Sequence, residues 1–144
     1  MNNIFNKTFE NLTSQKLKVV DKDIERPWGG FFVIYEDNAQ DFSNIYFNGL
    51  NTEEIKVSGK LSLKILIIEP NKRLSWQYHH RRSEIWKIVS GAIKVVTSHD
   101  NVERKENILK EGDEIRLSGR ERHRIIGLDE YSVVAEIWIH TDKD

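Results

Sequence analysis

The sequence predicts a single all-β domain, a sandwich or barrel of antiparallel strands, preceded by a short N-terminal arm. Residues 61–140 alternate short runs rich in Ile, Val, Leu and Trp with turn-forming residues. No helical period separates these runs, which excludes a parallel α/β sheet. A chain of 144 residues suffices for one core and is too short for two domains of ordinary size. We therefore expect an arm over residues 1–23 and one domain over residues 24–144.

One or two short helices are expected before the strands. In the arm, Phe5, Phe9 and Leu12 have the i, i+4, i+7 spacing of an amphipathic helix. A second helix is predicted over residues 39–50, because Asn38 and the residue three places later have N-cap and N3 spacing. The apolar arm positions need a surface to cover, and this favours a homodimer.

The strands follow from Leu61 onward. Turns are predicted at Pro70-Asn71, at Ser90-Gly91 and around Gly112, where residues that favour turns interrupt the apolar runs. The predicted strands are 61–69, 74–78, 84–89, 92–97, 114–117, 123–126 and 133–140.

Composition excludes several classes of function. The 22 basic and 23 acidic residues give a net charge of -1, so a nucleic-acid or anionic-membrane partner is not expected. The absence of Cys excludes disulfides, thiolate metal sites and thiol nucleophiles. The sequence has no apolar run of about 18 residues and does not start like a secretory signal, so a cytoplasmic protein is expected.

Four residues of ligand type are expected to meet at one place. Gln77 and His79 share one face of a strand, and Glu84 opens the next strand and can return to the same place. His123 follows the Gly112 turn and a further short strand. An amide oxygen, two imidazoles and a carboxylate suit a divalent metal such as Zn, Mn, Fe, Co or Ni, which the sequence does not distinguish.

These spacings resemble the two motifs of the cupin superfamily, G-x5-H-x-H-x4-E-x6-G and G-x5-P-x-G-x2-H-x3-N. Residues 71–91 fit the first motif without a gap, with Gln77 in place of its first His, and the second motif begins at Gly112 and reaches His123. The resemblance implies a double-stranded β-helix, the cupin jelly-roll barrel, with a bound metal.

A closer resemblance is to the type II mannose-6-phosphate isomerases and to small stand-alone cupins labelled as phosphomannose or phosphoheptose isomerases. It covers about residues 24–140 and rests on Arg26-Pro27-Trp28-Gly29, on residues 74–86 (Leu-Ser-Trp-Gln-Tyr-His-His-Arg-Arg-Ser-Glu-Ile-Trp) and on Val89-Ser90-Gly91. The Gln at position 77 is typical of that branch. Arg81 and Ile85 stand where the branch has His.

The resemblance implies a metal-dependent aldose–ketose isomerase acting on a sugar phosphate, of the mannose 6-phosphate and fructose 6-phosphate type. Arg82 has the strand parity of Glu84 and is expected to bind the phosphate, with help from Lys64, while Trp86 lines the cavity. The catalytic base stays open between Lys64, Glu136 and a metal-bound hydroxide.

Two other functions remain open at this point. One is a non-catalytic cupin that binds a sugar or a sugar phosphate, and the other is a different metal-dependent cupin enzyme, such as an Fe(II) oxygenase. The second has less support, because two His with Gln and Glu is not the commonest ligand set for that chemistry.

Overall fold

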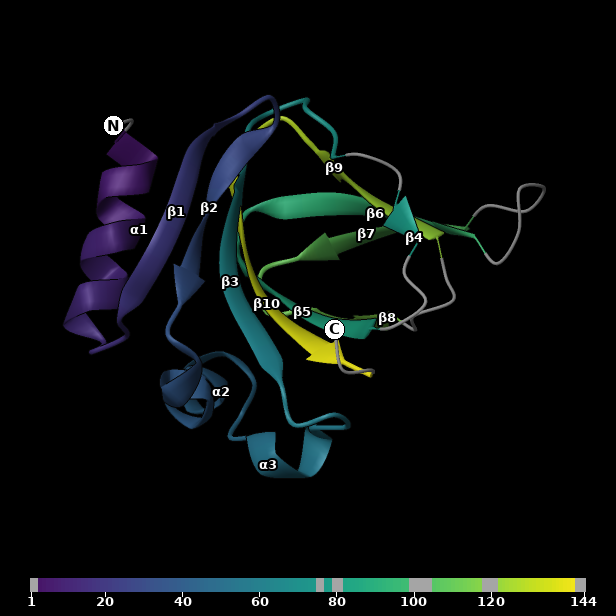
Figure 1. The fold of residues 1–144 in the computed structure, drawn as a ribbon. Coiled ribbons are helices and arrows are strands. Elements are labelled where there is room, and N and C mark those ends of the chain that lie inside the picture. Colours follow the sequence, from purple (N-terminus) through teal and green to yellow (C-terminus); the bar gives the residue numbers. More distant parts are fainter. Residues whose placement is uncertain (1–2, 75–76, 79–81, 99–104, 118–121, 142–144) are drawn as a thin grey trace.

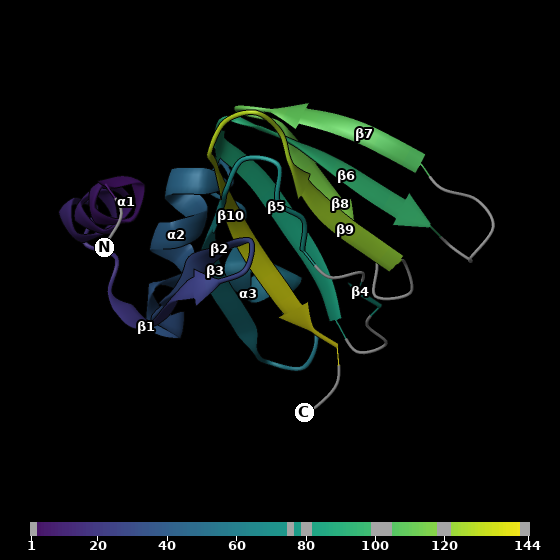
Figure 2. The ribbon, with the colours of Figure 1, turned by 90° about the horizontal axis from the view of Figure 1, so that it is seen from above.

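A computed structural model describes residues 3–74, 77–78, 82–98, 105–117 and 122–141, without the side chains of residues 77, 78 and 82. Two antiparallel sheets face each other and enclose an apolar interior (Figures 1 and 2). The larger sheet has the strand order β1-β2-β3-β10-β5-β8 and the smaller one β4-β9-β6-β7. The strands are β1 (Val19–Arg26), β2 (Gly29–Ile34), β3 (Leu61–Ile68), β4 (Gln77–Tyr78), β5 (Arg82–Ser90), β6 (Ala92–Ser98), β7 (Lys105–Lys110), β8 (Glu114–Leu117), β9 (Arg122–Gly127) and β10 (Ser132–His140). The predicted all-β class is confirmed.

The larger sheet is buried on both faces in its central strands. In β3, Leu66 and Ile68 face the interior between the sheets, whereas Leu63 and Ile65 belong to a second apolar cluster on the outer face. Because both faces need apolar residues, β3 reads as a nearly continuous hydrophobic run. Lys64 is the one charged residue of β3, and it lies on the inner face of the strand.

Helix α1 (Asn3–Ser14) packs on the outer face of the larger sheet (Figure 1). Phe5 and Leu12 are buried there, and the rings of Phe5 and Phe9 lie 6.4 and 5.7 Å from that of Phe32 on β2. These apolar positions thus cover the sheet of their own chain. The homodimer stays a prediction, but it loses this argument.

The N-terminal segment also adds a strand. The boundary expected between residues 23 and 24 lies inside β1, which pairs with β2 over its length. The sequence prediction omitted β1, β2 and β7. Most residues of β1 and β7 are exposed, so these two strands lack the apolar runs that marked the others.

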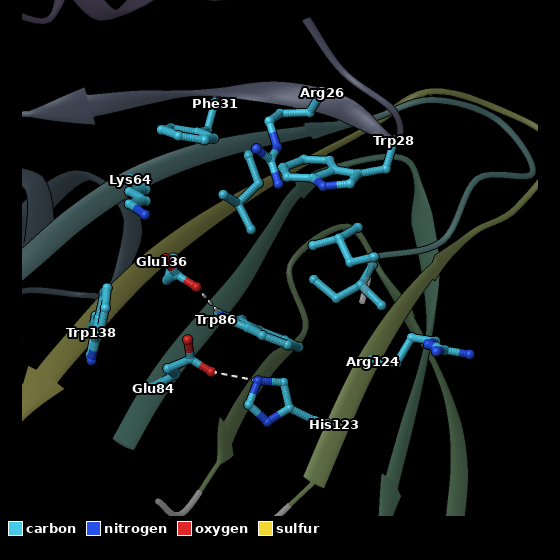
Figure 3. A pocket seen from close by; sticks show the side chains of 13 residues that line it. Arg26, Trp28, Phe31, Lys64, Glu84, Trp86, His123, Arg124, Glu136 and Trp138 are labelled. Atoms are coloured by element: carbon cyan, nitrogen blue, oxygen red, sulfur yellow. Dashed lines mark hydrogen bonds and ion pairs between the residues drawn. The ribbon is translucent and has the colours of Figure 1, made fainter. Parts of the chain in front are cut away.

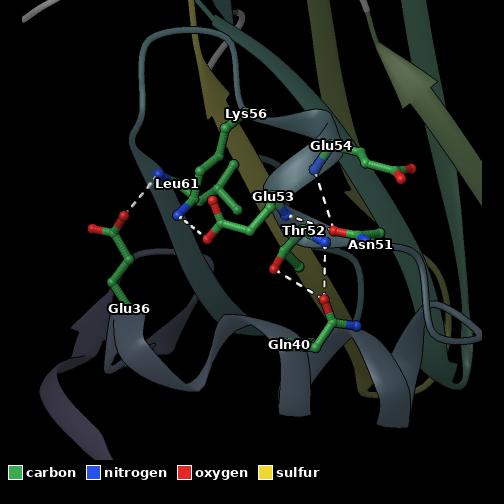
Figure 4. Close-up of polar contacts among 8 residues, drawn as sticks. All are labelled: Glu36, Gln40, Asn51, Thr52, Glu53, Glu54, Lys56 and Leu61. Carbon is green, nitrogen blue, oxygen red and sulfur yellow. Dashed lines mark hydrogen bonds and ion pairs between the residues drawn. The ribbon is translucent and has the colours of Figure 1, made fainter.

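A short helical corner precedes β3 (Figure 4). It comprises the 3-10 helix η1 (Glu36–Asn38), α2 (Ala39–Tyr46) and α3 (Thr52–Ile55), so the helix predicted over residues 39–50 ends four residues early. The predicted cap was wrong, because the Asn38 side chain accepts the Lys18 backbone N–H at 2.9 Å instead of capping α2.

One side-chain contact stabilises this corner internally, and another ties it to the sheet. The Asn51 Oδ1 caps α3 by accepting two backbone N–H groups, and the Glu36 carboxylate accepts the Leu61 N–H at 3.1 Å (Figure 4). The second contact fixes the first residue of β3, the strand that carries Lys64. Among the described residues, no helix is long and apolar enough to cross a membrane.

Candidate functional site

A cavity of about 360 Å³ lies between the two sheets (Figure 3). Residues of both sheets and of the β1–β2 turn line it. They are Arg26, Trp28, Phe31, Lys64, Leu66, Leu74, Glu84, Trp86, His123, Arg124, Ile125, Glu136 and Trp138. Charged and imidazole groups therefore face a space that is otherwise bounded by aromatic and aliphatic side chains.

Glu84 and His123 meet in this cavity from opposite sheets. Glu84 lies on β5 and His123 on β9, and the Glu84 Oε2 lies 2.8 Å from the His123 Nε2 (Figure 3). Each side chain is only 4% exposed. The Trp86 ring contacts the His123 ring edge to face, with the centroids 5.3 Å apart, and so restricts its orientation.

The other two predicted metal ligands are described less fully. Gln77 pairs with His123 in the β4–β9 ladder, so its backbone lies directly beside that histidine, but its side chain lies outside the described part of the structure. His79 lies outside the described residues altogether. That the Gln77 and His79 side chains lie close to Glu84 and His123 therefore stays a prediction.

A row of three polar side chains crosses the inner face of the larger sheet. Glu136 on β10 pairs with Lys64 on one side and with Trp86 on the other, which places all three on the same face. The Trp86 Nε1–H donates to the Glu136 Oε1 at 3.0 Å. The Lys64 ammonium lies over the rings of Phe31 and Trp138, 4.7 and 5.5 Å from their centroids.

Burial changes the acidity of Glu136. The pKa of its carboxyl is raised from 4.5 to about 8, chiefly by loss of solvation and next by the neighbouring Glu84 carboxylate. The Lys64 ammonium and the Trp86 N–H act against this rise. Glu136 can therefore hold a proton at neutral pH and exchange it there.

Five residues that the sequence singled out for the site line this cavity, and their roles stay predictions: Lys64, Glu84, Trp86, His123 and Glu136. Arg82 begins β5, but the direction of its side chain is not described. Arg124, which neighbours His123 on β9, also borders the cavity, and its guanidinium points away from Glu84 (Figure 3).

Sequence reasoning missed two cavity residues near the N-terminus. Arg26 and Trp28 belong to the Arg-Pro-Trp-Gly motif, which was noted as a resemblance without a role for its residues. The motif itself was the available signal. Its position in the cavity depends on the pairing of β1 and β2 with β3, which the strand pattern did not reveal.

The donors present suit a divalent metal ion. A buried carboxylate oxygen and an imidazole nitrogen 2.8 Å apart match two adjacent ligands, since bonds of about 2.1 Å at right angles place their donor atoms about 3 Å apart. Within the described ranges, no group of three or more His, Cys, Asp or Glu side chains gathers around one point. Glu84 and His123 could thus supply two donors to a metal ion, and a complete ligand set needs further side chains.

Comparison with known proteins places the chain in a family. Residues 36–125 match the model described as "Mannose-6-phosphate isomerase C-terminal". The chain belongs to the mannose-6-phosphate isomerase C-terminal family. The matched region contains Glu84 and His123 and stops before Glu136.

The chain is similar to the alginate biosynthesis protein AlgA of Pseudomonas aeruginosa, with 27% identity over 73 residues. The match covers 51% of this chain and 11% of AlgA, so the chain spans about a tenth of the length of that relative.

Solved structures agree with the cupin fold. KdgF from a Halomonas species superposes with a TM-score of 0.60 at 14% identity, covering 86% of this chain and 88% of KdgF. A mutant of the oxalate decarboxylase OxdC of Bacillus subtilis superposes with a TM-score of 0.62 at 14% identity, covering 86% of this chain and 28% of OxdC. At these identities the likeness establishes the fold alone, and the predicted cupin barrel is confirmed.

Proposed function

We propose that this protein is a metal-dependent aldose–ketose isomerase that acts on a sugar phosphate of the mannose 6-phosphate and fructose 6-phosphate type. The observation that carries the proposal is the cavity itself, in a member of the mannose-6-phosphate isomerase C-terminal family. It combines a buried carboxylate–imidazole pair with a second carboxyl group that can exchange a proton near neutral pH.

Glu84 and His123 would hold a divalent ion together with Gln77 and His79. When bound, such an ion supplies positive charge that stabilises negative charge developing on the carbonyl and hydroxyl oxygens of a sugar. Glu84 and His123 reach the cavity from opposite sheets, so the barrel fixes their spacing before any ligand arrives.

Isomerisation moves a proton between two neighbouring carbon atoms, and Glu136 is well suited to that task. A carboxyl group with a pKa of about 8 can accept a proton from carbon and return it at neutral pH. The Trp86 N–H holds one of its oxygens in place, and Lys64 lies beside it in the same row. Lys64 remains the alternative proton-transfer group.

The cavity also suits the size and charge of the substrate. A volume of about 360 Å³ lies at the lower end of the range for small-molecule sites, which favours a monosaccharide phosphate over a longer saccharide. Lys64, Trp86 and, from the sequence, Arg82 would contact the substrate, the two cations on its phosphate.

A second candidate is a non-catalytic cupin that binds a sugar or a sugar phosphate. The observation in its favour is that Arg81 and Ile85 stand where the resembling isomerases have His. Binding without turnover would support this reading.

The test is an isomerisation assay. Protein purified anaerobically and loaded in turn with Zn, Mn, Fe, Co and Ni is incubated with mannose 6-phosphate, fructose 6-phosphate and other aldose and ketose phosphates. We expect turnover that a chelator abolishes and that Glu136→Gln or Lys64→Met reduces, with Arg116→Gln on the exposed face of β8 as the matched control. Sugar-phosphate binding without turnover on the whole panel would contradict the isomerase proposal.

A further inference from the structure

Arg26 stands at one end of the cavity. It is the last residue of β1 and lines the same space as Glu84 and His123. In Figure 3 the Arg26 guanidinium lies beside the Trp28 indole at one end, Glu84 and His123 lie at the other end, and Lys64 and Glu136 lie between them. The cavity therefore has a cationic end away from its proposed metal ligands.

The backbone holds this end rigidly. Arg26 pairs with Gly29, so that Pro27 and Trp28 form a two-residue turn between β1 and β2. The Trp28 carbonyl accepts the Glu69 N–H at 2.8 Å, which ties the turn to the end of β3. Gly29 has a φ of 139°, and a Cβ there would collide with the Ile67 carbonyl oxygen, so the turn requires glycine. The backbone position of Arg26, from which its side chain extends, is therefore fixed.

The guanidinium can accept an anionic ligand. The Arg26 Nη1 lies 3.9 Å from the Asp23 Oδ2, which is longer than a charge-assisted hydrogen bond, and Arg26 is 50% exposed. Such an exposed pair contributes little, and a phosphate can compete with Asp23 for the planar N–H groups. Phosphate oxygens match this planar arrangement better than they match an ammonium.

We propose that Arg26 binds the anionic group of the ligand at the end of the cavity opposite Glu84 and His123. The inference rests on the proposed function for its ligand class, a sugar phosphate. It adds a position and replaces Arg82, two residues from Glu84 on β5, as the main phosphate ligand. The phosphate then lies away from the carbon atoms that react near Glu84, His123 and Glu136. The site therefore takes sugars phosphorylated at the terminal carbon in preference to those phosphorylated at the anomeric carbon.

The experiment measures binding, not turnover. Dissociation constants of mannose 6-phosphate, mannose 1-phosphate and mannose are determined by calorimetry for the wild-type chain, Arg26→Gln and Arg26→Lys, each at the same metal content. Arg116→Gln is the matched control, since it removes an arginine from the exposed side of β8. Inorganic phosphate is titrated in parallel, and thermal unfolding checks that each variant is folded.

We expect the wild type to bind mannose 6-phosphate more tightly than the other two sugars. Arg26→Gln should raise the dissociation constant of mannose 6-phosphate by about tenfold or more and leave that of mannose unchanged. The variant then loses the preference for the phosphorylated sugar. Arg26→Lys should fall between, and Arg116→Gln should match the wild type.

Two results would overturn the inference: an unchanged preference in Arg26→Gln, or an equal loss for mannose 6-phosphate and mannose. Inorganic phosphate separates this failure from that of the proposed function. If phosphate binds in an Arg26-dependent manner while no sugar phosphate is isomerised, Arg26 stands as an anion site and the isomerase proposal fails. If the protein isomerises a sugar phosphate but Arg26→Gln does not change phosphate binding, the isomerase proposal stands and the Arg26 inference fails.

Discussion

At the scale of single residues, Glu136 couples the cavity to the stability of the fold. Its pKa is raised to about 8 in the folded chain, chiefly by burial, against 4.5 for an ordinary Glu. Between these pH values the unfolded chain releases this proton and the folded chain keeps it. The folded state then binds more protons than the unfolded state, so this group makes stability fall as pH rises.

We therefore predict that Glu136→Gln gains stability over the wild type as pH rises. In metal-free protein, the difference in the free energy of unfolding should grow from about pH 4.5 and level off above about pH 8. Urea unfolding across this range measures it. A difference that stays constant with pH would show that Glu136 is ionised normally in the folded chain.

Arg82 carries the prediction that comes from the sequence alone. It is the alternative to Arg26 as phosphate ligand, at the Glu84 end of the cavity. If the phosphate lies there and the Arg82 side chain shares the direction of Glu84, Arg82→Lys should raise the dissociation constant of mannose 6-phosphate by about tenfold, or about 1.4 kcal/mol, at unchanged metal content, and Arg26→Gln should change it little. Arg81→Lys should do little. Were Arg81 the sensitive position, the strand parity assumed for Arg82 would be wrong.

At the scale of elements, helix α1 seals the outer face of the larger sheet. Leu12 is 1% exposed in the cluster beneath α1, whereas Phe9 is 37% exposed at its edge. Leu12→Ala should lower the free energy of unfolding by about 2–5 kcal/mol, because it leaves a cavity in a packed cluster.

Phe9→Ala is the matched control for α1 and should cost clearly less than Leu12→Ala, because part of the Phe9 ring already contacts water. Chemical denaturation measures both variants. Equal and small losses would mean that α1 is not packed on the sheet in solution.

Apolar spacing predicted strands such as β3 and missed β1 and β7 for a physical reason. Strands such as β3 are buried on both faces and so contain several consecutive apolar residues. β1 and β7 each have mostly exposed residues, and their pairing with β2 and β6 defines them more than their own composition does.

The site was predictable in proportion to how local its determinants are. The spacing of Glu84 and His123 follows two motifs, and Lys64 and Glu136 were noticeable as charged residues within apolar strands, which the structure places in the cavity. Arg26 was missed because its place depends on the β1–β2 pairing, and the Asn38 cap failed because a distant backbone N–H competes for that side chain. Long-range contacts decide both cases.

At the scale of the whole molecule, the oligomeric state remains a prediction. A homodimer is expected by analogy with other small cupins, and α1 no longer supplies a reason for it, since its apolar residues pack on their own chain. Light scattering at micromolar concentration should give twice the 17.0 kDa mass of the chain. A monomeric mass would contradict the dimer without affecting the cavity.

The central claim is that the barrel holds a divalent ion between its two sheets. Metal content per chain, measured by elemental analysis after anaerobic loading and gel filtration, tests it most directly. We predict up to one ion per wild-type chain, partial loss in Gln77→Ala because an amide oxygen is a weaker ligand, and none in His79→Ala or His123→Ala, with β-sheet circular dichroism retained. Full metal occupancy in the His79→Ala, His123→Ala double variant would contradict the account.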